Sequence, residues 1–390
     1  MVYKIADNIY SPLGVTTAEN YAAVRAGRSL LRSYPAGTLA LPQPFMASLI
    51  EWGGVAPLAG YTRFERIVIE SVRRALKQTT VDVRSPRLLF VLATTKGNVE
   101  LLEGNVPSTK GNDISLPSSA DRVLLGVAAQ AVADYFGFVN TPLVVSNACI
   151  SGLSAQLTAQ RLLDGGAYDV AVVCGADVLS RFVVSGFGSL MALSPSACRP
   201  FDMERTGLNL GEAAATIIYK RGERQEVRRE SAAWQMMRGA VRNDAYHISS
   251  PSPKGEGCYR AISAAMGDMT ASDLAFVNAH GTATMYNDEM ESAAITRAGL
   301  AAVAVNSLKG YFGHTMGAAG VLETVLSMTA VDDGCILGTR GFEELGVSHR
   351  INVTAGHQPT SKRAFLKLMS GFGGCNAALV FKKTGGSDDC

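Results

Sequence analysis

The sequence predicts an α/β protein made of two similar halves. Strand-like apolar runs alternate with helix-like runs along the 390 residues, which is the pattern of α/β proteins. Residues 87–95 (RLLFVLATT) form a continuous apolar run, as expected for a strand buried on both faces. In each half a strand that ends in Asn and small residues leads into a long helix rich in small residues, at 144–166 and at 303–334. A duplicated α/β fold with a functional site between the halves explains these observations.

The elements of the first half follow from local signals. Residues 118–136 start with Ser and Asp and continue with helical apolar spacing, which predicts a helix. Residues 142–148 predict a strand, and residues 149–166 predict a helix that the pair Gly165-Gly166 ends. Two more apolar runs predict buried strands, at 170–177 and 213–221.

The second half repeats this order. Strands are predicted at 274–280 and 301–307, a helix at 315–334, and two strands joined by a Gly-rich turn at 364–383. The charged run 221–230 predicts a solvated boundary, so we expect residues 1–230 to form one half and residues 231–390 the other. The last seven residues, TGGSDDC, are expected to be disordered.

The composition argues against several classes of protein. Hydrophobic residues make up 47% of the chain and charged residues 18%, which predicts a large core. The net charge of +2 gives no sign of a nucleic-acid or anionic-membrane partner. No segment resembles a signal peptide or a membrane span. Seven cysteines without CxxC spacing argue against disulfides and a metal site, so we expect a cytoplasmic protein without a metal.

Cys149 is the first candidate for chemistry. It stands in VVSNACISG (144–152), where the predicted strand turns into a helix. Backbone N–H groups and the dipole at a helix N-terminus favour a thiolate and can also hold an oxyanion. We therefore predict that Cys149 is a nucleophile. Cys174, Cys258 and Cys335 are expected to be ordinary buried cysteines.

Two histidines stand in loops that follow predicted strands of the second half. His280 lies in VNAHGTAT (277–284) with the hydroxyl residues Thr282 and Thr284. Loops at the carboxyl ends of strands are where α/β proteins bind ligands. Read alone, a histidine in this position is more often structural than functional.

The segment NSLKGYFGHTMGAAGVLE (306–323) brings together Lys309, His314 and Glu323. These three side chains can form one hydrogen-bonded unit that fixes the tautomer of the histidine, although a Gly-rich loop with an incidental histidine fits too. In SGFGGCN (370–376), three glycines around Phe372 would let a backbone N–H approach a reacting atom.

In this order, the segments SNACISG, NAHGTAT, NSLKGYFGHTMGAAG and SGFGGCN resemble the elongating β-ketoacyl-acyl-carrier-protein synthases of the thiolase superfamily. Residues 11–29, 199–215 and 243–253 resemble further segments of that family. The resemblance implies a duplicated five-layer αβαβα thiolase-like fold and a homodimer or a heterodimer with a related synthase. It also implies that no cofactor is needed, because the substrates are carried on the phosphopantetheine of acyl-carrier protein.

The resemblance also implies roles for single residues. Cys149 would accept the acyl group as a thioester. His280 and His314 would serve malonyl decarboxylation and the enolate that it produces. The other matched positions are Lys309 and Glu323 as supporting residues, Phe372 as a gate and oxyanion donor, and Thr282 and Thr284 as contacts to the pantetheine arm.

The expected reaction is a decarboxylative Claisen condensation with malonyl-acyl-carrier protein, which yields a 3-oxoacyl-acyl-carrier protein. A thiolase, or a non-catalytic partner of the chain-length-factor type, are the alternatives. The absence of a thiolase-like second cysteine argues against a thiolase. The presence of Cys149 argues against a non-catalytic partner.

The segments YKIADNIY (3–10) and TTKGNVE, which starts at Thr94, depart from the family pattern, as does Cys375, and the loop 100–118 is short. These departures favour a specialised pathway, such as polyene lipid synthesis, over housekeeping fatty-acid synthesis.

Acyl-carrier proteins are acidic, so basic side chains are expected at the mouth of the site. Arg205 is the first candidate for this contact and Arg63 the second.

Overall fold

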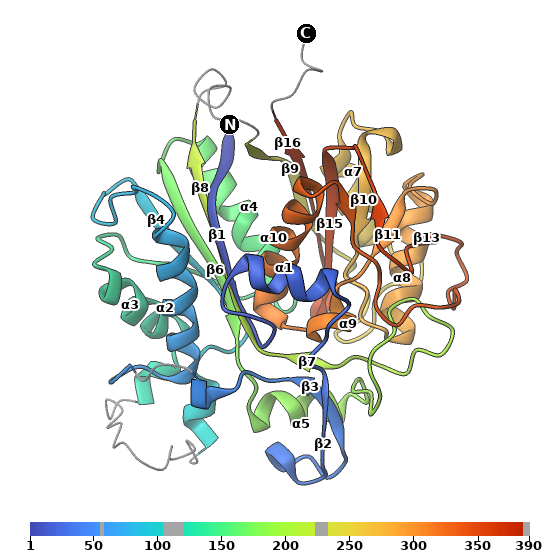
Figure 1. The fold of residues 1–390 in the computed structure, drawn as a ribbon, viewed down its shortest axis with the longest axis horizontal. Helices are drawn as coiled ribbons and strands as arrows, with labels where there is room; N and C mark the ends of the chain where they lie inside the picture. The colour runs from blue at the N-terminus through green and yellow to red at the C-terminus, as the bar shows by residue number, and fades with distance from the viewer. Residues whose placement is uncertain (55–57, 104–119, 223–232, 385–390) are drawn as a thin grey trace.

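The computed structural model describes residues 1–54, 58–103, 120–222 and 233–384, and it has a large central sheet (Figure 1). The strands of the first half are β1 (Val2–Tyr10), β4 (Leu88–Ala93), β5 (Leu143–Val145), β6 (Val170–Asp177) and β8 (Ala213–Arg221). Those of the second half are β9 (Trp234–Asn243), β10 (Leu274–Asn278), β11 (Ala304–Asn306), β15 (Ala364–Gly371) and β16 (Cys375–Lys383), with β13 (Asn352–Val353) beside β11.

The two halves of the sheet have the same topology. The strand order is β1-β8-β6-β4-β5 in the first half and β9-β16-β15-β10-β11 in the second. In both halves the first two pairings are antiparallel and the next two are parallel. A short antiparallel contact between β1 and β9 joins the halves, pairing Val2 with Met236 and Tyr3 with Gln235. The duplication predicted from the sequence is therefore confirmed.

Helices form three layers around the two halves of the sheet (Figure 1). The helices α2 (Arg63–Leu76) and α3 (Leu125–Phe136) pack on the outer side of the first half, and α7 (Glu256–Met266) and α8 (Met285–Arg297) on the outer side of the second. The helices α4 (Ser151–Asp164) and α10 (Ala319–Asp332) lie between the halves. This gives the expected five layers, αβαβα. The remaining helices are α1 (Thr17–Arg25), α5 (Arg181–Ser189) and α9 (Lys309–Phe312).

The smaller strands lie outside the main sheet. β2 (Arg32–Tyr34), β3 (Phe45–Ser48) and β7 (Leu210–Gly211) form one small sheet, and β12 (Cys335–Ile336) pairs with β14 (Gln358–Pro359).

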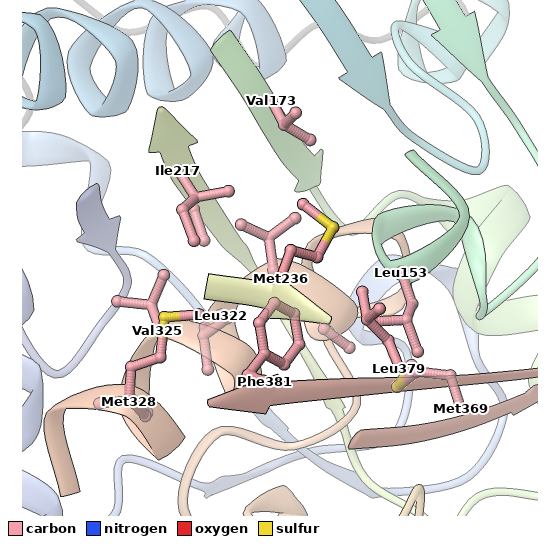
Figure 2. Close-up of a cluster of buried hydrophobic side chains, with 14 of the residues drawn as sticks. Leu153, Val173, Ile217, Met236, Leu322, Val325, Met328, Met369, Leu379 and Phe381 are labelled. Carbon is pink, nitrogen blue, oxygen red and sulfur yellow. The ribbon is translucent and has the colours of Figure 1, made fainter. Parts of the chain in front are cut away.

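The middle layer is the largest core of the protein. Side chains from α4 and α10 meet strands of both halves there, as Figure 2 shows for Leu153, Val173, Leu322 and Phe381. Because both halves bury apolar surface against the same two helices, the hydrophobic effect fixes one half against the other.

Glycines allow α4 and α10 to approach each other closely. A Cβ at Gly152 would lie 2.7 Å from the carbonyl oxygen of Gly317, and one at Gly320 would lie 2.4 Å from the amide nitrogen of Leu153. Both distances are too short for any side chain, so these positions require glycine. The contact brings the start of α4, which follows Cys149, against residues 317–320, which follow His314 in the chain and include the start of α10.

Most predicted elements are found, with shifted ends. The predicted strand 142–148 is reduced to Leu143–Val145, because β5 lies at the sheet edge and pairs only with Val91–Ala93 of β4. The predicted boundary after residue 230, most of the loop 100–118 and all of the tail but its first residue lie outside the described residues. Within the described ranges, no helix is long and apolar enough to cross a membrane.

Candidate active site

Cys149 occupies a sharp turn between β5 and α4. The preceding residue, Ala148, has φ = 44°, a left-handed conformation that is unfavourable for a residue with a Cβ. The hydroxyl of Ser151 stabilises this turn, because it accepts from the amide of Asn147 at 2.8 Å and donates to the carbonyl of Ala148 at 2.6 Å. The turn places Cys149 one residue before the N-cap of α4, Ile150. Backbone strain is thus concentrated beside the candidate nucleophile.

Burial keeps the Cys149 thiol protonated at rest. Only 7% of the residue is exposed, and burial raises the pKa of the thiol to about 11, although the charges of Lys96 and Lys309 oppose the shift. The helix N-terminus favours a thiolate, as the sequence predicts, but in the free protein burial has the larger effect and this prediction is wrong. Loss of solvation outweighs the favourable charges, so nucleophilic attack requires the thiol to lose its proton to an acceptor.

A buried pair of carboxylates holds the His280 loop. The backbone N–H groups of His280 and Gly281 each donate to Glu291 of α8 at 2.7 Å, and that of Thr282 donates to Asp288 at 3.0 Å. Both carboxylates are fully buried. Three consecutive amides are therefore fixed by one face of α8, and the imidazole of His280 is held at the end of β10.

The structure fixes the tautomer of His314. Its Nδ1 accepts a hydrogen bond from the backbone N–H of Met316 at 3.3 Å, so in the neutral ring the proton is on Nε2. Burial first, and then the charge of Lys309, holds the pKa of His314 well below its ordinary value. Within the described part of the chain Nε2 has no partner. His314 therefore offers a free N–H donor in a buried site.

Cys149, His280 and His314 come together in space. Their candidate ligand atoms lie within 4.8 Å of one another, and the two imidazole rings are 5.0 Å apart between centroids at an angle of 80°. This spacing would also suit three ligands of a metal ion. The positive charges of Lys96, Lys309 and Lys367, which act on these histidines, oppose the binding of a cation.

A buried ionic cluster lies behind the histidines. The Nζ of Lys309 donates to Oε1 of Glu323 at 2.6 Å, and the Nζ of Lys367 donates to its Oε2. All three residues are at most 3% exposed. Although burial alone would raise it, the two lysines hold the pKa of Glu323 below its ordinary value.

The remaining predicted site residues line one cavity. It has a volume of about 330 Å³ and is lined by Cys149, His280, His314, Thr282, Thr284 and Phe372, among others. The hydroxyls of Thr282 and Thr284 are 2.8 Å apart. Phe372 lies in the turn between β15 and β16, 37% exposed and 5.9 Å from the ring of Phe187. Its backbone N–H donates toward the sulfur of Cys149.

The prediction of Arg205 as a surface contact is wrong. Arg205 is only 5% exposed, and its guanidinium donates to the carbonyls of Asp202 and Gly346. Its Nε lies 4.0 Å from the carboxylate of Asp288. Because Asp288 accepts from the amide of Thr282, Arg205 stabilises the His280 loop instead.

Arg63 is half-buried against Glu100, with which it forms an ion pair. No described residue that lines the cavity is a lysine or an arginine. The large exposed side chains at the cavity are aliphatic or aromatic, namely Leu190, Met191, Met285, Tyr286 and Phe372.

Three charged residues near the site were not singled out from the sequence: Lys96, Asp177 and Lys367. Asp177 accepts from the hydroxyls of Thr94 and Thr95 and from the amide of Gly317. The Nζ of Lys96 donates to Thr95 and contacts the sulfur of Met316. For Asp177 and Lys96 the available signal is a charged residue at or just after the carboxyl end of an apolar strand, and for Lys367 it is a charged residue in the middle of one.

Comparison with known proteins agrees with the geometry. Residues 58–225 match the family model "Beta-ketoacyl synthase, N-terminal domain", and residues 235–343 match "Beta-ketoacyl synthase, C-terminal domain". The ketoacyl synthase alpha subunit of the tetracenomycin polyketide synthase from Streptomyces glaucescens is 30% identical over 96% of this chain and 95% of its own. The 3-oxoacyl-[acyl-carrier-protein] synthase 2 of Vibrio cholerae is 29% identical over 80% of each chain.

The fold is shared with solved structures. A ketosynthase from Xenorhabdus doucetiae, solved in complex with its chain length factor, superposes with a TM-score of 0.84 over 98% of both chains at 23% identity. The chain is an enzyme of the β-ketoacyl synthase family, with the thiolase-like fold of that family.

Proposed function

We propose that this enzyme condenses an acyl group, held as a thioester on Cys149, with malonyl-acyl-carrier protein to give a 3-oxoacyl-acyl-carrier protein. The observation that carries the proposal is the cavity in which a cysteine at a strained turn meets two buried histidines, one of them with an unpartnered Nε2–H. A nucleophile and enolate donors are the two sets of groups that a decarboxylative condensation needs.

In the first half-reaction, the sulfur of Cys149 attacks the thioester carbonyl of the acyl-carrier protein. The C–S bond to Cys149 forms and the bond to the pantetheine sulfur breaks; the proton lost by the thiol leaves with the pantetheine thiol. The backbone N–H groups of Cys149 and Phe372 are the donors proposed for the oxyanion. The latter already donates toward the sulfur, and the former lies beside the backbone of Gly371, where a Cβ would be 3.1 Å from it.

In the second half-reaction, malonyl thioester loses CO₂, and the electron pair of the broken C–C bond moves into an enolate. The N–H of His314, together with His280, stabilises the enolate oxygen. The enolate carbon then attacks the Cys149 thioester, the new C–C bond forms, the C–S bond to Cys149 breaks, and the departing thiolate takes up a proton from water. Neutral histidines can serve this step because the N–H of a neutral imidazole donates a hydrogen bond to the developing enolate oxygen. Burial holds the pKa of both well below the ordinary value.

The direct test is mass spectrometry of the protein after incubation with acyl-acyl-carrier proteins, followed by addition of malonyl-acyl-carrier protein. We expect an acyl adduct on Cys149, release of CO₂ and a product longer by two carbons. An unmodified cysteine would favour the non-catalytic alternative, and condensation without CO₂ release would favour a thiolase. A panel of acyl primers in the same assay gives the chain length. The departures of residues 3–10 and of Cys375 from the family pattern support a specialised pathway.

The acyl-carrier protein is the proposed macromolecular partner, and the apolar side chains around the cavity are the proposed contact. Leu190, Met191, Met285 and Tyr286 surround the route to Cys149, so a carrier protein that delivers a pantetheine arm must pass them. The proposed reaction needs no cofactor of its own.

The edge of the sheet supports a proposed dimer. β5 ends the eleven-stranded sheet, and Leu143 on it is 37% exposed. Edge strands offer unpaired backbone groups to another chain. We expect a dimer through β5 in sedimentation at micromolar concentration, and we expect Leu143→Lys to shift it toward monomer. A fully active wild-type monomer would contradict this, whereas an inactive monomer would point to a heterodimer like the ketosynthase–chain length factor complex.

A further inference from the structure

Lys367 is a fully buried lysine that the reaction scheme above does not use. It lies in β15, opposite Asn278 in the parallel ladder with β10, and its residue exposure is 0%. Its Nζ donates to Oε2 of Glu323 and lies 3.4 Å from the carbonyl oxygen of Ala279. Ala279 directly precedes His280, so Lys367 contacts the backbone at the start of the histidine loop.

The cluster around Lys367 contains more positive than negative charge. Glu323 of α10 is shared by Lys309 of α9 and Lys367 of β15, so two ammonium groups face one carboxylate. Burying a charge is unfavourable unless it is paired, and Lys309 alone would already neutralise the charge of Glu323. The second lysine is therefore an excess charge placed behind the two histidines. Burial, opposed by Glu323, lowers the pKa of Lys367 to about 8, which still leaves it largely protonated at neutral pH.

We propose that Lys367 is a positioning residue for the decarboxylation step, which holds the Ala279 carbonyl at the start of the His280 loop and supplies the excess positive charge behind both imidazoles. The inference rests on the proposed function and extends it to a residue that touches neither the substrate nor the reacting atoms.

The charged groups around this cluster determine how loss of Lys367 changes the pKa of the two histidines. Burial is the main cause that holds the pKa of His280 low, followed by the charges of Lys309, His314 and Lys367. For His314 the causes are burial, Lys309, Lys96 and Lys367. The carboxylate of Glu291, on α8, raises the pKa of Lys367. Loss of the Lys367 charge therefore raises the pKa of both histidines and makes the enolate anion less stable.

Cys149 is affected by other lysines. The charges that lower its pKa belong to Lys96 and Lys309. The pKa of the thiol is therefore an internal control. Removal of Lys367 should raise the pKa of both histidines and leave the pKa of the thiol unchanged.

The experiment compares Lys367→Met with Lys382→Met, an exposed lysine on the neighbouring strand β16. The rate of CO₂ release from malonyl-acyl-carrier protein is measured from pH 5 to 9 beside the pH profile of Cys149 alkylation. For Lys367→Met we expect a decarboxylation rate about tenfold lower at neutral pH, because the enolate anion loses one nearby positive charge. In the pH profile of CO₂ release, we also expect the acid limb, where protonation of the histidines lowers the rate, to move to higher pH. The pH profile of Cys149 alkylation should not change. Lys382→Met should match the wild type in all three.

A folded Lys367→Met variant with the wild-type rate and acid limb would overturn the inference. A rate loss without a shifted limb would mean that Lys367 acts only on structure, which also overturns it. If the wild type itself released no CO₂, the proposed function would be wrong instead.

If Lys367→Met does not fold, the pH profile of CO₂ release by the wild type gives the answer. The pKa of the Cys149 thiol is about 11 and that of Lys367 about 8, so deprotonation of Lys367 should reduce CO₂ release above pH 8 while the thiol stays protonated. A rate that stays constant from pH 7 to 9.5 would overturn the inference.

Discussion

Replacing Cys149 with glutamine is expected to abolish condensation and to leave malonyl decarboxylation in place. Acyl transfer needs the sulfur, so no acyl-enzyme can form without it. Decarboxylation needs only donors for the enolate oxygen, and these come from His280 and His314. The glutamine amide is neutral and of similar reach to an acylated cysteine, and the histidines are held by contacts that do not involve Cys149, through Glu291 and Met316.

The measurement is CO₂ release from malonyl-acyl-carrier protein beside the mass of the acyl adduct. Cys335→Ala is the control, because this cysteine lies in β12 and does not line the cavity; it should keep both half-reactions. If Cys149→Gln released no CO₂, the assignment of decarboxylation to the histidines alone would be wrong, even though the chain is a β-ketoacyl synthase.

The sequence predicts the fold well because its signals are local. The helix at 149–166 and the strand pair at 364–383 follow from apolar spacing and glycine positions, and the structure contains both with small shifts at the ends. The duplication is visible in the sequence only as two similar strand-and-helix segments. The structure extends it to five strands in each half of the sheet that share one topology.

The sequence predicts the electrostatics of the site less well, because these depend on contacts between distant residues. The helix N-terminus at Cys149 is a local signal, whereas the burial that raises the pKa of its thiol comes from the whole surrounding core. Arg205 carries a charge in a matched segment, which made it a plausible surface contact. Only the packing shows that its charge points inward, toward Asp288. Lys367 was read as part of a strand, and its approach to Glu323 spans 44 residues of sequence.

Replacing His314 with alanine is expected to give the opposite result to Cys149→Gln, namely acylation without decarboxylation. The Nε2–H of His314 is a donor and cannot take the proton of the thiol, because Nδ1 is occupied as an acceptor of the Met316 amide. Acylation therefore does not depend on it. Decarboxylation does, and loss of one positioned donor in a buried site should slow CO₂ release roughly 10²–10³-fold.

Two further variants separate the loss of the His314 donor from general damage to the site. His314→Gln places an amide N–H close to the former Nε2 and should recover part of the lost rate, which a change of packing alone would not explain. His349→Ala, at an exposed histidine, should behave as the wild type. Acyl-adduct mass and CO₂ release are measured for each variant. If His314→Ala could not be acylated, His314 would have to take part in thiol activation, and its assignment as an enolate donor alone would fail.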